Sequence, residues 1–161
     1  MPATNTIITE DYNMKKLTLA LGLAATLTAG QAAWAEDDLT MKVYKSPSCG
    51  CCGDWVDHMK ENGFEVDVTE TGNMNQVKMD AGLTPQLASC HTAFVDDYVI
   101  EGHVPAADVR RLIEEQPQAH GLSVPGMPVG SPGMEIGDRK DNYQVLLFNE
   151  AGQTRIFAEH N

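Results

Sequence analysis

The sequence has little positive charge. Its 161 residues include 11 lysines and arginines against 23 aspartates and glutamates, which gives a formal net charge of −12 at pH 7. The acidic residues are scattered along the chain rather than grouped in one segment. Such a surface repels the phosphates of nucleic acids and the headgroups of anionic lipids. The composition therefore predicts no nucleic-acid partner, and it suits a soluble protein that meets cations.

The sequence also lacks an apolar run long enough for a comfortable membrane span. The run Leu17–Ala29 follows Lys15-Lys16 and precedes an Ala-x-Ala pattern at 33–35. A basic start, a short apolar middle and such an ending are typical of a cleavable secretory signal. A membrane anchor is the alternative, but it needs about 20 apolar residues. We therefore predict export to the periplasm, and Met14 is the natural start of such a signal.

Cleavage is expected before Glu36. Residues 1–35 are then an N-terminal extension with a signal peptide, and residues 36–161 form one domain with its own core. We predict no stable membrane insertion of this mature chain. No internal repeat divides it further.

Cysteine is scarce and unevenly spread. Three of the four cysteines fall within four residues, at Cys49, Cys51 and Cys52, and the fourth is Cys90. Disulfides are the default expectation for an exported protein. A bridge within the cluster closes too short a loop to restrict the unfolded chain much. The concentration of thiols therefore indicates chemistry more than architecture.

The cysteine cluster is predicted to lie where a strand meets a helix. Residues 41–45 alternate between polar and apolar side chains, as a short strand does. Residues 51–62 carry apolar residues at helical spacing and stop at Gly63. Free N–H groups and the positive end of the helix dipole favour thiolate over thiol at such a junction.

The remaining pattern predicts a mixed α/β fold. The expected elements are a strand at 64–68, a helix at 71–81 with Val77 inward, a hairpin at 92–95 and 98–101, a helix at 105–115, and a C-terminal hairpin at 143–148 and 154–158. Residues 118–141 are rich in glycine and proline, and we expect no core element there. This order is that of a thioredoxin-like domain, with a central mixed sheet flanked by helices and an added C-terminal β-hairpin.

That topology predicts which distant residues meet. The third strand would run antiparallel to the first, so Cys90 and His91 would lie beside the cysteine cluster. The fourth strand would end at the same edge and deliver His103. We therefore expect a pocket of four thiols with imidazoles at its margin.

Four sequence blocks resemble the DUF411 family. They are Ser-Pro-Ser-Cys-Gly-Cys-Cys at 46–52, Ser-Cys-His-Thr at 89–92, Glu-Gly-His-Val-Pro-Ala at 101–106, and the glycine- and proline-rich segment 121–135. The resemblance spans nearly the whole mature chain. It implies a thioredoxin-like fold, a cysteine-bound copper site and a periplasmic role in copper resistance. The chain departs from true thioredoxins because Cys51 intrudes between Cys49 and Cys52. Cys90 also stands where a cis-proline would precede the third strand.

The thiols favour metal over dithiol exchange, because unoccupied reactive thiols are a liability in an oxidising compartment. Soft thiolates select Cu(I) or zinc. Since Cys51 and Cys52 are neighbours at a helix start, we expect them to point in different directions. One ion would then hardly reach all four sulfurs, so we predict several Cu(I) ions with bridging thiolates. The alternatives are a thiol–disulfide oxidoreductase using Cys49 and Cys52, and a pure copper chaperone or storage module.

Histidines and methionines complete the predicted ligand set. His91 and His103 are candidate ligands or supporting groups at the rim. Met127 and Met134 lie in the glycine- and proline-rich segment, where there is little core to fill, and a thioether suits Cu(I). Mixed sulfur and imidazole donors would support both Cu(I) and Cu(II), and hence copper oxidoreductase activity with periplasmic export or redox partners.

Four other methionines are predicted to serve packing rather than metal binding. Met41, Met59, Met74 and Met79 fit helix or strand faces. Trp55, one helical turn after Cys51, is expected to shield the site from water.

Overall fold

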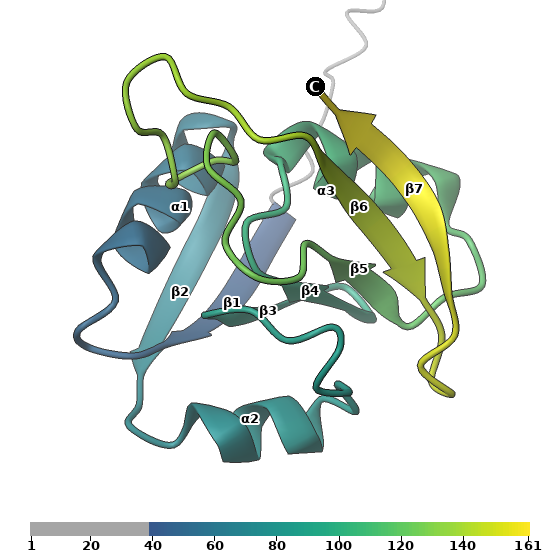
Figure 1. The fold of residues 1–161 in the computed structure, drawn as a ribbon. Coiled ribbons are helices and arrows are strands. Elements are labelled where there is room, and N and C mark those ends of the chain that lie inside the picture. Colours follow the sequence, from purple (N-terminus) through teal and green to yellow (C-terminus); the bar gives the residue numbers. More distant parts are fainter. Residues whose placement is uncertain (1–38) are drawn as a thin grey trace, which may run out of the picture. The chain divides into compact units, whose positions relative to one another are not determined.

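The computed structural model describes residues 39–161, so the predicted signal peptide and its cleavage point lie outside the described residues. Within residues 39–161 no helix is long and apolar enough to cross a membrane. The described elements run in the order β1 Leu39–Lys45, α1 Gly50–Glu61, β2 Phe64–Glu70, α2 Met74–Asp80, β3 Thr92–Val95, β4 Tyr98–Glu101, α3 Ala106–Glu115, β5 Gly121–Ser123, β6 Tyr143–Phe148 and β7 Thr154–His160 (Figure 1).

Seven strands form one mixed sheet in the order β2-β1-β3-β4-β5-β6-β7. Strand β1 pairs in parallel with β2. It pairs antiparallel with β3, as the sequence predicted. Strands β3 and β4 form the predicted hairpin, with Asp96 in its turn at a φ of 48°. The C-terminal hairpin of β6 and β7 is also confirmed, although β7 runs to His160.

The sheet has a larger and a smaller core. The larger core joins the sheet to α1 and α3 through Trp55, Val56 and Met59 of α1 and Val109 and Leu112 of α3. The smaller core contains Ala81, Leu87, Val99 and Phe148 and lies next to α2. Consecutive residues of β4 divide between them, Val99 in the smaller core and Ile100 in the larger. Because strand side chains alternate between faces, the two cores lie on opposite faces of the sheet.

Helix α2 differs from its prediction. It begins at Met74 rather than at residue 71, Val77 is only half-buried, and no residue of the helix is fully buried. Met79, which we expected to pack, is 64% exposed. The helix instead reaches the sheet through the polar side chain of Lys78, which contacts Thr92 and Glu101. Apolar periodicity was therefore the wrong signal for this helix.

Strand β5 corrects the expectation that residues 118–141 hold no core element. Its three residues are all buried, and it bridges β4 and β6. A Cβ atom at Gly121 would collide with the carbonyl oxygen of Val99, so only glycine permits this strand to approach β4. The glycine that suggested a loop is what allows the pairing. Without β5, the C-terminal hairpin would have no hydrogen-bonded link to the rest of the sheet.

Candidate metal centre

Three of the four cysteines lie at the start of α1. Cys49 is the residue that caps the helix, and its N–H donates to the Ser46 carbonyl 3.1 Å away. Cys49 and Cys52 form a disulfide with their Cα atoms 5.4 Å apart, whereas Cys51 and Cys90 are free thiols. The predicted strand-to-helix junction is confirmed, with the helix beginning at Gly50.

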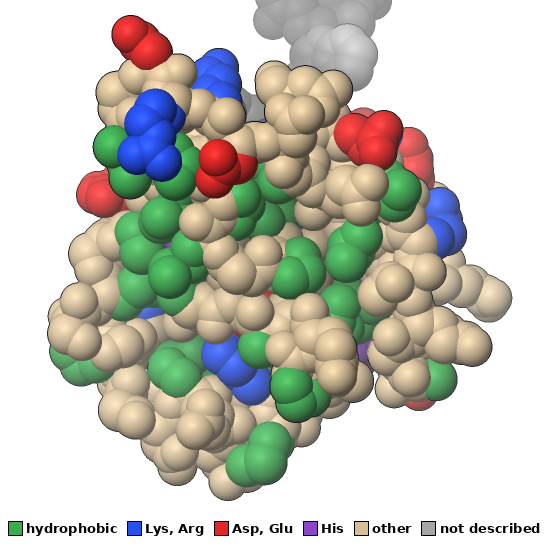
Figure 2. Space-filling model, viewed as in Figure 1, with side chains coloured by type: hydrophobic (Ala, Val, Ile, Leu, Met, Phe, Trp, Pro, Cys, Tyr) green, Lys and Arg blue, Asp and Glu red, His purple; other side chains and the backbone are tan. Residues whose placement is uncertain are grey.

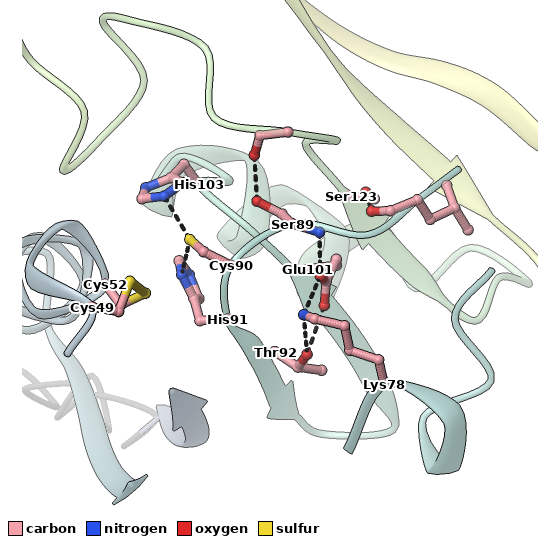
Figure 3. A network of polar contacts seen from close by, with 12 residues as sticks. Cys49, Cys52, Lys78, Ser89, Cys90, His91, Thr92, Glu101, His103 and Ser123 are labelled. Carbon is pink, nitrogen blue, oxygen red and sulfur yellow. Dashed lines mark hydrogen bonds and ion pairs between the residues drawn. A yellow bond between two sulfur atoms is a disulfide. The ribbon is translucent and has the colours of Figure 1, made fainter. Parts of the chain in front are cut away.

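Cys90 reaches this helix from the segment just before β3. Because β3 runs antiparallel to β1, its start lies beside the end of β1, from which the chain enters α1. Figure 3 shows Cys90 facing the Cys49–Cys52 disulfide from the opposite side of the site. The predicted meeting of residues some forty positions apart is therefore confirmed. The entropic cost of closing a loop rises only slowly with its length, so a separation of some forty residues is no obstacle to this contact.

The four cysteine sulfurs converge closely. All of them lie within 4.8 Å of one another, and the sulfurs of Cys49 and Cys51 are 3.5 Å apart. Sulfurs around one tetrahedral zinc would be about 3.8 Å apart, given Zn–S bonds of about 2.3 Å. The expectation that Cys51 and Cys52 point too far apart for a single ion is therefore wrong. The first turn of α1 and the Cys49–Cys52 disulfide bring these sulfurs together.

The electrostatic setting of Cys90 favours its neutral form when no metal is bound. Burial raises the pKa of this thiol to about 11, and the neighbouring Cys51 adds to the increase. A thiolate at this position therefore needs a compensating positive charge. A bound cation would supply that charge and would displace the thiol proton.

His103, between β4 and α3, faces Cys90. Its Nε2 lies 3.0 Å from the Cys90 sulfur, while its Nδ1 lies 2.7 Å from the Pro132 carbonyl oxygen. A carbonyl only accepts hydrogen bonds, so Nδ1 carries the proton and donates, and the neutral ring presents the Nε2 lone pair to the sulfur. Burial lowers the pKa of His103 and so favours that neutral ring.

His91 lies on the other side of Cys90, with its Nδ1 3.3 Å from the sulfur. The side chain is fully buried, and among the described residues its Nε2 has no hydrogen-bond partner. The ring packs on Trp55, with centroids 4.3 Å apart, and meets His103 edge-on at 5.0 Å. Trp55 is also fully buried, as expected of a shielding side chain. Burial holds the pKa of His91 well below its usual value, so this ring is also neutral.

The glycine- and proline-rich segment returns to the site through Pro132 and Gly133. The Pro132 carbonyl accepts a hydrogen bond from His103. The next residue, Gly133, packs tightly on α1, because a Cβ atom there would lie 2.7 Å from both the Cys51 carbonyl oxygen and the Trp55 backbone nitrogen. Met127 is 53% exposed and Met134 is half-buried, so both remain only candidate ligands. The glycine-proline composition signalled a loop, but not which residue would reach the centre.

The donor set fits a soft, thiophilic metal. Cys90, His91 and His103 form a second group whose ligand atoms lie within 4.8 Å of one another, and it shares Cys90 with the four sulfurs. Sulfur and neutral imidazole ligands suit Cu(I), Cu(II) and zinc. The neutral ring of His91 adds one more buried lone pair, on whichever ring nitrogen carries no proton. We refer to Cys49, Cys51, Cys52, Cys90, His91 and His103 together as the candidate metal centre.

The comparisons with known proteins point to one family. The family model described as "Protein of unknown function, DUF411" matches residues 87–134. A solved structure of copper resistance protein copG, form 2, is 45% identical, with a TM-score of 0.74 over 77% of this chain and 99% of that one. Form 1 is 46% identical, with a TM-score of 0.73 over 76% of this chain and 98% of that one. The chain belongs to the DUF411 family. Among curated proteins none matches.

Membership in the DUF411 family confirms the resemblance that the sequence blocks carried. The matched residues include Cys90, both rim histidines and the returning segment as far as Met134. The cysteines at the start of α1 lie outside that match, but the solved relatives cover about three quarters of this chain. The candidate metal centre therefore draws on one part inside the family match and one part outside it.

Proposed function

We propose that this protein is an exported copper-resistance protein that binds copper at the candidate metal centre. The observation that carries the proposal is the convergence of four cysteine sulfurs within 4.8 Å of one another. The copper resistance protein copG structures, 45% and 46% identical, support copper as the metal. The proposal includes cleavage before Glu36 and a periplasmic location, where copper exporters or redox proteins are partners.

The sheet plan supports a thioredoxin-like framework as part of the proposal. The strand order β2-β1-β3-β4, with β1 and β2 parallel and β3 and β4 antiparallel, is that expected of the thioredoxin-like topology. Strands β5 to β7 are then an extension at one edge. In this framework the start of α1 and the segment before β3 form one site.

We further propose that the centre holds more than one Cu(I) ion, with thiolates bridging between ions. Four sulfurs and two imidazoles offer more donors than one ion of low coordination number uses. The imidazoles of His91 and His103 also suit Cu(II), so the same centre supports interconversion of the two copper states. Met127 and Met134 are proposed as additional thioether ligands that favour Cu(I).

Copper binding by all four sulfurs requires a reduced centre. The Cys49–Cys52 disulfide must take up two electrons and two protons to give two thiols, and the S–S bond breaks in that step. Metal binding by the thiols then releases protons, because the ligand is the thiolate. An external dithiol that becomes a disulfide supplies the electrons in the experiment below.

The test is metal loading under anaerobic conditions. The mature protein, reduced with excess dithiol and freed of it, should bind more than one Cu(I) per chain in competition with a chromophoric Cu(I) chelator. Zinc should be displaced by Cu(I). Loading with at most one copper per chain would overturn the multinuclear proposal, and zinc retained against Cu(I) would overturn copper as the metal.

A second candidate function is thiol–disulfide exchange, which the Cys49–Cys52 disulfide favours. The two cysteines sit at the amino end of α1, where a thiolate is stabilised. The crowding of Cys51, Cys90 and His103 around them favours metal instead. Rapid reduction of a disulfide substrate by the copper-free protein, lost in Cys49→Ser but kept in Cys90→Ser, would support this second function.

A further inference from the structure

Behind Cys90, on the side away from the other sulfurs, lies a network of charged and polar groups. Figure 3 shows Lys78 of α2 and Glu101 at the end of β4 meeting beside Thr92 and Ser89. The side chains of Lys78 and Glu101 are 13% and 0% exposed. A buried carboxylate is costly unless its oxygens are well paired, so this site needs an explanation.

The oxygens of Glu101 are fully used. Oε1 lies 2.5 Å from the Lys78 ammonium and accepts a hydrogen bond of 2.6 Å from the Ser89 N–H. Oε2 accepts a hydrogen bond of 2.7 Å from the Thr92 hydroxyl, and Lys78 also donates to that hydroxyl over 3.1 Å. Burial raises the pKa of Glu101, while Lys78, Thr92 and Ser89 oppose that increase.

Two of these partners flank Cys90 and His91 in the sequence. Ser89 immediately precedes Cys90, and Thr92 immediately follows His91. The carboxylate therefore accepts one hydrogen bond from the backbone just before Cys90 and one from the side chain just after His91. Ser89 is also tied to the glycine- and proline-rich segment, because its hydroxyl donates to the Gly126 carbonyl.

We propose that Glu101, paired with Lys78, is a positioning residue that holds Cys90 and His91 in place for metal binding. The consequence for copper binding rests on the proposed function, whereas the positioning of Cys90 and His91 by Glu101 does not. The segment before β3 is otherwise irregular, and regular sheet pairing starts only at Thr92. The His91 carbonyl still accepts a hydrogen bond of 3.0 Å from the Gly102 N–H, and the bond from the Ser89 N–H to Glu101 holds the backbone on the other side of Cys90.

The network also accounts for the unusual attachment of α2. This helix has no fully buried residue, and Lys78 is the side chain that carries it to the sheet. Loss of the Lys78 ammonium would leave the buried Glu101 carboxylate without a compensating charge. That loss would disturb Ser89 and Thr92, which donate hydrogen bonds to the carboxylate. The charge of Lys78 thus stabilises the Glu101 carboxylate, and the carboxylate holds the backbone next to Cys90 in place.

The test separates the effect of the hydrogen-bond acceptor at residue 101 from the effect of the buried ion pair. Two double variants both remove the ion pair: Glu101→Gln with Lys78→Met keeps an oxygen for the Ser89 N–H, and Glu101→Ala with Lys78→Met does not. The alanine double variant should bind Cu(I) roughly tenfold more weakly than wild type, whereas the glutamine double variant should match wild type. Equal affinity of the two double variants would overturn the proposal.

A double-mutant cycle separates positioning from general loss of stability. In a background with both Cys90→Ser and His91→Gln the alanine and glutamine double variants should bind copper equally, because both ligands that Glu101 positions are gone. A deficit of the alanine variant that persists in this background would overturn the proposal. Asp108→Asn is the matched control, since it removes another buried carboxylate whose partners are Arg111 and His160.

A copper-free readout keeps failure of this inference distinct from failure of the proposed function. In the reduced protein, alkylation of Cys90 by iodoacetamide, followed by peptide mass spectrometry, should be faster in the alanine double variant and unchanged in the glutamine one. If the alanine variant does not fold, Thr92→Val removes one carboxylate bond at nearly constant volume. Faster amide exchange at Ser89 and faster alkylation of Cys90 in Thr92→Val support positioning, and wild-type values overturn it.

Discussion

Two groups of titratable side chains in the described part of the chain use histidine differently. In the candidate metal centre, His103 presents Nε2 to a thiol. In a second group, the hairpin cluster of Asp108, Arg111, Tyr143 and His160, the imidazole of His160 lies 2.7 Å from the Asp108 carboxylate. His160 also stacks on Tyr143, with ring centroids 4.9 Å apart.

The difference lies in what remains available to a ligand. The hairpin cluster ties α3 to β7, because Arg111 lies 3.4 Å from Asp108 and donates to the Phe157 carbonyl. Its imidazole is engaged by the Asp108 carboxylate, as in a structural contact. In the metal centre burial keeps both imidazoles neutral, and the Nε2 of His91 has no partner among the described residues. A neutral imidazole with a lone pair is the form that binds a metal.

The largest expected difference between the two regions is in copper affinity. Cys90→Ser should lower Cu(I) affinity nearly as much as Cys49→Ser, by roughly tenfold or more, because each removes one soft ligand. Asp108→Asn in the hairpin cluster should leave the affinity unchanged. Competition titration of the three reduced variants measures this. Wild-type affinity in Cys90→Ser would remove the segment before β3 from the centre.

The next effect concerns the contact of the returning segment with α1. Gly133→Ala should destabilise the protein by about 2 kcal/mol more than Gly137→Ala, because its Cβ atom collides with backbone atoms. Both glycines have positive φ, 79° and 56°, but a Cβ atom at Gly137 meets nothing within 4 Å. Chemical denaturation of the copper-free proteins measures the difference. Equal losses would mean that the segment is not seated on the helix.

The third effect is on acid stability. The pKa values of His91 and His103 are lowered, so the unfolded chain binds more protons as the pH falls below 6.5. The free energy of unfolding of the copper-free protein should therefore decrease between pH 6.5 and 5, by at most about 1.4 kcal/mol per pH unit for each histidine. The decrease should be smaller in His103→Gln. The same slope in wild type and His103→Gln would show that this ring is not held neutral.

The smallest effect belongs to the hairpin cluster. His160→Gln should cost about 1 kcal/mol or less at pH 6, because the His160 side chain is 35% exposed and solvent screens its attraction to Asp108. Added salt should reduce the difference between wild type and the variant. Thermal unfolding at low and high salt measures it. A clear loss of copper affinity in His160→Gln would contradict the separation between the two regions.

The sequence determined the local elements and the residue types of the candidate metal centre. Alternation and helical spacing located β1, α1, the hairpin of β3 and β4, and α3, because these elements bury one face and carry their own stop signals. The spacing of Cys49, Cys51 and Cys52 marked the site, since three thiols within one helical turn serve no structural purpose. The topology predicted from the sequence also placed Cys90 and His103 beside them.

Only the tertiary structure decided the contacts made by irregular backbone and by buried polar groups. Nothing in the pattern around Gly121 distinguishes a strand from a loop, because close approach to Val99 selects it. Nothing in the sequence distinguishes Lys78 from a solvated helix residue, because only the fold buries Glu101 beside it. Pro132 offers only a carbonyl oxygen, a group that every residue has, so its bond to His103 leaves no trace in sequence. Such contacts depend on position in space rather than on residue type.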